Sequence, residues 1–166
     1  MIGMVVALAA YVTVYYCAIK NRRKVWLHAG YMLTTPLILF ESPFGRVLNM
    51  YAEPFLVRGP ADFGRILPAI LWSMALELVV VAAIWLKYRA RATPFLVAGG
   101  FIAAQMVTMG LLKDLPILKV LLTVIGETPS VVVWLTGFTI GVLTSWAGWQ
   151  VGKRRPVPIT AAVQPA

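Results

Sequence analysis

One acidic side chain, Glu77, falls near the middle of an otherwise uncharged apolar run, 66–85. A carboxylate at the centre of a bilayer costs about 2.5 to 3.5 kcal/mol on insertion scales. We therefore expect Glu77 to face other helices rather than lipid. There it could bind a ligand, an ion or a proton, or it could hold helices together through hydrogen bonds alone.

Polar side chains on three other apolar runs fall at a depth similar to that of Glu77 when residues are counted from the ends of each run. They are Thr34 and Thr35, Gln105 with Thr108, and Thr139. Hydroxyl and amide groups can donate hydrogen bonds to a carboxylate. The sequence therefore predicts a small polar chamber around Glu77, which would bind a ligand or a proton.

The only histidine, His28, lies one helical turn inside a predicted span, at about the depth of Cys17 on the preceding span. Imidazole is a common ligand of haem and metal ions, so a redox accessory protein that holds haem or quinone near His28 is one hypothesis. A second strong axial ligand is missing, because Met32 lies four residues later on the same helix face. We therefore disfavour haem and favour an interfacial histidine bonded to a carbonyl group or a lipid phosphate.

Glu41 and Arg46 flank a short stretch, 42–45, at the far end of the span that contains His28. One interpretation is an ion pair that closes a turn, and the other is that Arg46 binds an anionic head group or a carboxylate. The chain has none of the residue patterns typical of nucleophile elbows, phosphate-binding loops or zinc-binding His-Glu-x-x-His helices. The sequence thus favours a non-enzymatic role.

The composition indicates which elements must position these residues. Of 166 residues, 60% are hydrophobic and only 13% are charged, whereas soluble domains carry about 25% charged residues. Such a chain needs lipid as its solvent. The excess of 15 Lys and Arg over 6 Asp and Glu does not indicate nucleic-acid binding, because most of the positive charge lies in short clusters between apolar runs.

The apolar runs predict an all-α, polytopic transmembrane helical bundle with a single domain over 1–155 and a disordered tail over 156–166. The expected spans are about 1–19, 25–41, 66–86, 94–112 and 130–151.

Two segments between the runs are too polar or too short to span a bilayer. The stretch 42–65 is predicted to lie on the outer surface with one or two short helices, and 115–126 is predicted to be re-entrant or interfacial. Inside the second run, Pro36 predicts a kink near Met32–Thr35, with Thr34 and Thr35 bonding back to their own helix.

Basic clusters follow the first, third and fifth runs directly. By the positive-inside rule, they predict a cytoplasmic side for these ends, an outer N-terminus and a cytoplasmic C-terminus in a bacterial inner membrane. The clusters hold ten of the fifteen basic residues: Lys20, Arg22, Arg23, Lys24, Lys87, Arg89, Arg91, Lys153, Arg154 and Arg155.

The second run resembles a signature of uncharacterised bacterial small multi-span inner-membrane proteins, in which a basic turn precedes His-x3-Met-x2-Thr and an outer Pro-x-Gly-Arg. The resemblance covers 20–47 and implies the membrane fold, but no activity. Similar His-then-Met patterns occur in helical proteins of cytochrome oxidase assembly and in b-type cytochrome-like bundles, from which this chain departs by having one histidine. The matching residues here are His28, Met32, Thr35, Pro43, Gly45 and Arg46.

Together these observations predict an inner-membrane protein that binds a small ligand, or serves as an accessory subunit, around the Glu77 chamber. Its expected partners are membrane lipids and a membrane-protein partner or a second copy, and not nucleic acid. A proton-coupled transporter or channel that uses Glu77 is the first alternative, and the redox accessory protein at His28 is the second.

Overall fold

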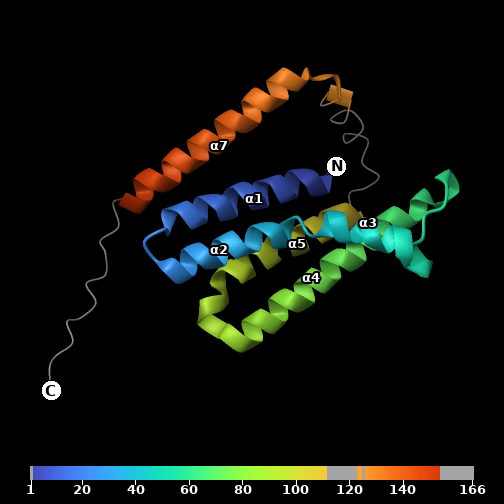
Figure 1. Ribbon diagram of the computed structural model, residues 1–166, viewed down its shortest axis with the longest axis horizontal. Helices are drawn as coiled ribbons and strands as arrows, with labels where there is room; N and C mark the ends of the chain where they lie inside the picture. The colour runs from blue at the N-terminus through green and yellow to red at the C-terminus, as the bar shows by residue number, and fades with distance from the viewer. Residues whose placement is uncertain (1, 112–122, 125, 154–166) are drawn as a thin grey trace.

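The computed structural model describes residues 2–111, 123–124 and 126–153, and its regular elements are all helical (Figure 1). The predicted all-α class is confirmed for this part of the chain. The predicted re-entrant segment 115–126 falls largely outside the described residues, and the predicted disordered tail 156–166 falls wholly outside them.

Six α-helices and three short 3-10 helices make up the described ranges. In chain order they are α1 (Ile2–Lys20), α2 (Val25–Ile38), α3 (Glu41–Tyr51), η1 (Glu53–Phe55), η2 (Pro60–Arg65), α4 (Ile66–Tyr88), η3 (Arg89–Ala92), α5 (Thr93–Leu111) and α7 (Ser130–Lys153).

Within the described residues, three helical stretches are long and apolar enough to cross a membrane: Gly3–Lys20, Pro60–Leu111 and Ser130–Lys153. The second stretch contains both α4 and α5, which η3 connects. Helix α2 has 14 residues and is shorter than the predicted span 25–41. At 1.5 Å per residue it covers about 21 Å, which is less than the roughly 30 Å of a bilayer core.

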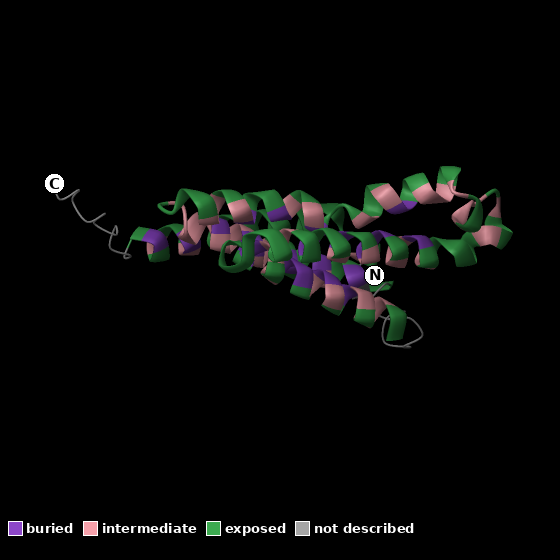
Figure 2. Cartoon of the chain, turned by 90° about the horizontal axis from the view of Figure 1, so that it is seen from below, coloured by how far each residue is buried: buried purple, intermediate pink, exposed green. Residues whose placement is uncertain are grey.

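Helix α1 forms the centre of the packing and contacts α2, α5 and α7 (Figure 1). Its inward face is made of small side chains, including Ala7, Ala10 and Ala18, which are almost fully buried. Small residues allow helix backbones to approach closely, and this is how helices associate in lipid. Buried residues are confined to the faces between helices, while the outer faces are exposed (Figure 2).

The predicted kink at Pro36 takes a different form. Helix α2 continues through Pro36 to Ile38, and the helical path breaks at 39–40 instead. Proline lacks the N–H that would bond to the carbonyl of Met32. The Thr35 hydroxyl donates to that carbonyl at 2.7 Å, as the sequence predicted, and so it replaces the missing bond.

The segment predicted to lie on the outer surface, 42–65, contains one α-helix and two 3-10 helices. Helix α3 packs against α4, and Gly45 is its buried residue. A Cβ at Gly45 would lie 3.4 Å from Ile70 and 3.6 Å from the Ser73 hydroxyl. This part of the chain is therefore an extension of the bundle along α4.

Most of the described basic residues gather at one end of the bundle, where the α1–α2 turn, η3 and the end of α7 lie (Figure 1). Aromatic rings accompany them, as expected at a membrane interface. Arg22 stacks on Trp149 at 3.7 Å from the ring centroid and donates to the Trp149 carbonyl at 3.1 Å. Arg22 therefore ties the α1–α2 turn to α7. Arg154 and Arg155 lie outside the described residues.

Candidate functional site

Helix α4 presents one inward stripe that contains a carboxyl group. Ala69, Ser73, Glu77 and Val81 are all buried, and their spacing of four residues places them on one face. The side chain of Glu77 is only 1% exposed. Glu77 therefore faces the bundle interior, as the apolar run around it predicted.

A second carboxyl group, Glu41, lies next to this stripe. Glu41 is the first residue of α3, where a negative charge interacts favourably with the helix dipole. Its Oε1 accepts a hydrogen bond of 2.6 Å from Nε2 of Gln105, which is buried on α5. Glu41 also interacts electrostatically with Glu77. Three helices therefore bring two carboxyl groups and one amide together.

Four buried oxygen atoms in this region have no hydrogen-bond partner among the described residues. They are Oε2 of Glu41, Oδ1 of Asn49, and Oε1 and Oε2 of Glu77. Burying an unpaired polar group is costly, and burying an unpaired charge costs much more. All four atoms are acceptors. These four oxygens therefore lack donors.

A cavity of about 440 Å³ adjoins this cluster, and we call it the α3 cavity. Glu41 lines it, but Glu77 does not. Its walls come from α1, α3, α4, α5 and the α2–α3 break, and its lining residues are Met4, Ala7, Leu39, Glu41, Ser42, Gly45, Arg46, Asn49, Ile66, Ile70 and Met109.

The predicted chamber residues are only partly brought together. Thr34 is fully buried, but its hydroxyl donates to the Tyr31 carbonyl of its own helix at 2.8 Å. Thr108 similarly donates to the Gln105 carbonyl at 2.9 Å. The hydroxyls of these threonines, and that of Thr35, thus satisfy their own helices and give no hydrogen bond to Glu77.

Thr139 does not join the chamber. It lies on α7, which packs on α1, and its side chain is exposed. Its hydroxyl donates to the Leu135 carbonyl at 2.7 Å. Depth counted along the chain placed Thr139 near Glu77, but the rotation and position of α7 point it away from the bundle.

His28 connects two helices at the basic end. Its Nδ1 lies 2.9 Å from the carbonyl oxygen of Ala18, which can only accept, so Nδ1 carries the proton. This is the carbonyl bond that the sequence analysis favoured. Among the residues that the structure describes, no group of three His, Cys, Asp or Glu side chains is arranged to hold a metal ion.

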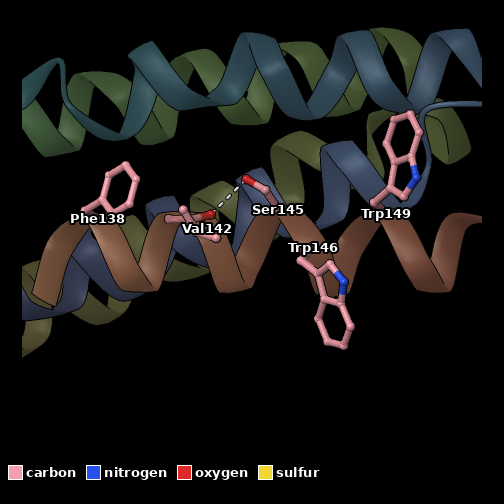
Figure 3. A pocket seen from close by; sticks show the side chains of 6 residues that line it. Phe138, Val142, Ser145, Trp146 and Trp149 are labelled. Atoms are coloured by element: carbon pink, nitrogen blue, oxygen red, sulfur yellow. Dashed lines mark hydrogen bonds between the residues drawn. The ribbon is translucent and has the colours of Figure 1, made fainter. Parts of the chain in front are cut away.

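A larger concavity of about 650 Å³ lies on α7, but its lining is mainly apolar (Figure 3). Phe138, Val142, Trp146 and Trp149 form most of its walls. Its polar side-chain groups are the indole N–H groups of the two tryptophans and the hydroxyl of Ser145, which donates to the Gly141 carbonyl at 2.8 Å. This surface has no unsatisfied acceptor and suits contact with hydrocarbon, so we place the candidate site in the α3 cavity.

The sequence analysis missed the role of Glu41, which it interpreted as the partner of Arg46. In the described part of the chain, Glu41 forms no ion pair with Arg46, and its bond is to Gln105. A signal for this position is present in the sequence. The inward residues Tyr31, Thr34 and Ile38 are spaced by three and four, and the same spacing leads next to Glu41.

Comparisons with protein-family models, with curated proteins and with solved structures gave no match to this chain. The resemblance of the second run to small multi-span inner-membrane proteins therefore stays a prediction. The function must be argued from the site itself.

Proposed function

We propose that this chain is a multi-pass protein of the bacterial inner membrane that binds a small ligand in the α3 cavity without converting it chemically. The observation that carries this proposal is the pair of buried acceptor oxygens without a donor, Oε2 of Glu41 and Oδ1 of Asn49, on residues that line the cavity. A ligand that supplies donors and positive charge would remove the cost of burying them.

The missing chemistry points to an amine. An ammonium group offers three N–H donors on one positive charge, and charge-assisted hydrogen bonds to carboxylates are the strong ones. Oε2 of Glu41 and Oδ1 of Asn49 are buried, but they belong to residues that line the α3 cavity, so rotation of either side chain would bring its oxygen to a molecule inside the cavity. We infer that the ligand carries a primary amine.

Ethylammonium is the simplest probe of this proposal. The protein is purified into phosphatidylcholine nanodiscs, and its thermal unfolding is followed with added ethylammonium chloride or with sodium chloride at equal ionic strength. Ethylammonium should stabilise the protein by about 2.7 kcal/mol at a hundredfold excess over its Kd. Glu41→Gln should remove this stabilisation.

Glu53→Gln is the matched control. Glu53 lies on η1 at the same end of the bundle, is exposed, and pairs with Arg58 at 3.9 Å rather than lining the α3 cavity. Glu53→Gln removes the same charge as Glu41→Gln, but outside the cavity. It should therefore leave the response to ethylammonium unchanged. A wild-type protein that does not respond to ethylammonium, or a Glu41→Gln protein that still does, would contradict the proposal.

We also propose five spans, with the basic end of the bundle in the cytoplasm. Helices α1, α4, α5 and α7 supply four spans. The second combines α2 with the start of α3, because α2 alone is too short. Single cysteines introduced at Lys24 and Arg58 in a Cys17→Ser background should react with membrane-impermeant maleimide from opposite sides. Labelling of both from one side would overturn this arrangement.

A proton-coupled transporter or channel is the second candidate, and one observation favours it. Glu77 is nearly inaccessible and does not line the α3 cavity, yet it interacts electrostatically with Glu41, which does. A proton could therefore reach Glu77 where a larger ligand could not. Proteoliposomes loaded with a pH-sensitive dye should then show a proton leak that Glu77→Gln abolishes. A leak equal to that of empty liposomes removes this candidate.

An accessory role would place the same site within a larger complex. Helix α7 packs on α1 and exposes apolar side chains along most of its length, which suits a partner helix, a second copy or lipid. Native mass spectrometry after mild solubilisation should show a stoichiometric partner or a homo-oligomer if this role is correct. A monomer with lipid alone speaks against it.

A further inference from the structure

We propose that the α3 cavity binds a zwitterionic group that carries a primary ammonium and a phosphate, as in the head group of phosphatidylethanolamine. The ammonium would lie at Glu41, and the phosphate at Arg46. This inference rests on the proposed ligand-binding function and adds the chemical class of the ligand.

Helix α3 presents its polar side chains to the cavity on one face. Ser42, Gly45, Arg46 and Asn49 all line the cavity, and they follow one another at positions i, i+3, i+4 and i+7. Glu41 completes the set at the start of the helix. A guanidinium group and two acceptor groups therefore border one space.

The charges around this space are opposite, and they do not neutralise each other. Within the described ranges, Arg46 forms no ion pair and no hydrogen bond, while Oε2 of Glu41 and Oδ1 of Asn49 have no donor. A simple cation would leave Arg46 without a counter-charge, and a simple anion would meet the Glu41 carboxylate. A molecule that carries both charges satisfies both sides, because guanidinium binds phosphate in a bidentate geometry.

The remaining walls are apolar and reach the surface of the bundle. Leu39, Ile66, Ile70 and Met109 supply much of this lining, and Met4 and Leu39 are 65% and 50% exposed. An acyl chain attached to the bound head group could therefore leave the cavity along apolar side chains into the bilayer. A free amino-phosphate has no apolar chain that could contact these apolar walls, so we assign the ligand to a membrane lipid.

Lipid selectivity is the decisive measurement. Phosphatidylethanolamine and phosphatidylcholine carry the same two charges, but the quaternary ammonium of the choline lipid has no N–H donor. Binding of each lipid to the purified protein is measured by native mass spectrometry over a lipid titration. Loss of a hydrogen bond to a charged group costs enough to expect a preference for phosphatidylethanolamine of about tenfold to a hundredfold.

Substitutions separate the two ends of the head group. Glu41→Gln should reduce the preference for the ethanolamine lipid, since it removes the carboxylate that the ammonium contacts. Arg46→Gln should weaken both lipids alike. Arg58→Gln is the control, because Arg58 is exposed and pairs with Glu53 outside the cavity. If Glu41→Gln does not purify, Glu41→Asp shortens the side chain that reaches the ammonium and should lower the preference in the same way.

Two further results would overturn the assignment in different ways. If soluble phosphoethanolamine competes with the lipid at equal concentration, the ligand is a free solute rather than a lipid. If neither lipid nor phosphoethanolamine binds selectively but ethylammonium still stabilises the protein through Glu41, the head-group assignment fails and the proposed amine site stands. If ethylammonium also has no effect, both fail.

Discussion

Replacing Glu77 by methionine should make the ligand-free protein more stable. In most buried sites, removal of a polar side chain destabilises, because a hydrogen bond is lost. Here neither carboxyl oxygen of Glu77 has a hydrogen-bond partner among the described residues, and the side chain is 1% exposed. The substitution therefore removes the free-energy cost of burying two unpaired oxygens, and it breaks no hydrogen bond.

The size of the effect follows from the burial of these two atoms. Leaving a buried acceptor unsatisfied costs about 1 to 3 kcal/mol, and methionine fills a similar volume with flexible apolar atoms. We expect Glu77→Met to raise the free energy of unfolding by about 1 to 3 kcal/mol. For a chain of this length, that corresponds to a rise in Tm of about 2 to 12 °C.

The assay is unfolding of the purified protein in phosphatidylcholine nanodiscs, with no amine present, followed by circular dichroism at 222 nm or by tryptophan fluorescence. Ser73→Ala is the control on the same face of α4. The Ser73 hydroxyl donates to the Ala69 carbonyl within its own helix at 2.8 Å, so its removal should destabilise by about 1 kcal/mol or less.

A loss of stability in Glu77→Met would refute this reasoning. If Glu77 only joins helices by hydrogen bonds, its removal should cost about 1 to 2 kcal/mol, which is the value for such bonds in model peptides. The sign of the change therefore separates a carboxyl group kept for binding from one kept for helix association. Proteins often retain such destabilising groups at functional sites.

Two further predictions concern how α7 is held against α1. Gly148→Leu should separate the helices and lower the Tm, because a Cβ there would already lie 3.1 Å from Ile19, whereas Gly141→Leu should be neutral because nothing lies within 4 Å of its Cβ position. Equal Tm values for the two variants would contradict this packing. Arg22→Leu should destabilise the protein by about 1 to 2 kcal/mol, since it removes both the stacking on Trp149 and the hydrogen bond to the Trp149 carbonyl. If its denaturant unfolding curve matches that of the wild type, this contact is not formed.

The helices could be predicted from the sequence because their ends are marked by charge and by proline. Helices α1 and α7 end at Lys20 and Lys153, where basic clusters begin. Helix α4 ends at Tyr88, within the basic cluster 87–91. The predicted and observed boundaries of these helices agree to within about two residues, since a long apolar run stops where hydrocarbon stops. The burial of Glu77 followed from the same physics.

The composition of the site could be predicted less well, because depth along a helix does not define its rotation or its neighbours. Thr34, Gln105 and Thr139 were all assigned to one level, yet only Thr34 and Gln105 are buried. Thr139 belongs to a helix that stands at the edge of the bundle. Nothing in the residues of α7 indicates this position, since its apolar and small side chains are spread around the whole helix.

Glu41 shows how a local rule and a longer pattern can disagree. The local rule interprets Ser42-Pro43-Phe44-Gly45 as a turn, which favours an ion pair between Glu41 and Arg46. The longer pattern spaces inward residues by three and four, and it leads from Ile38 to Glu41 and on to Gly45. The structure follows the longer pattern, because Pro43 lies in the first turn of α3, where proline is tolerated.

The break at 39–40 and the continuous inward face together explain why the site can exist. An uninterrupted helix would carry Glu41 inward with all its backbone groups satisfied, but it would leave little space beside it. The helix stops at Ile38 and restarts at Glu41, and the cavity lies beside this break, where Leu39 and Glu41 both line it. Irregular backbone within a membrane protein is tolerated where it lines such a cavity. Pro36 lies close before this break, and Thr35 limits its cost by bonding to the Met32 carbonyl. The backbone is thus irregular only at 39–40, and the carboxyl group of Glu41 lies directly after it, on the lining of the cavity.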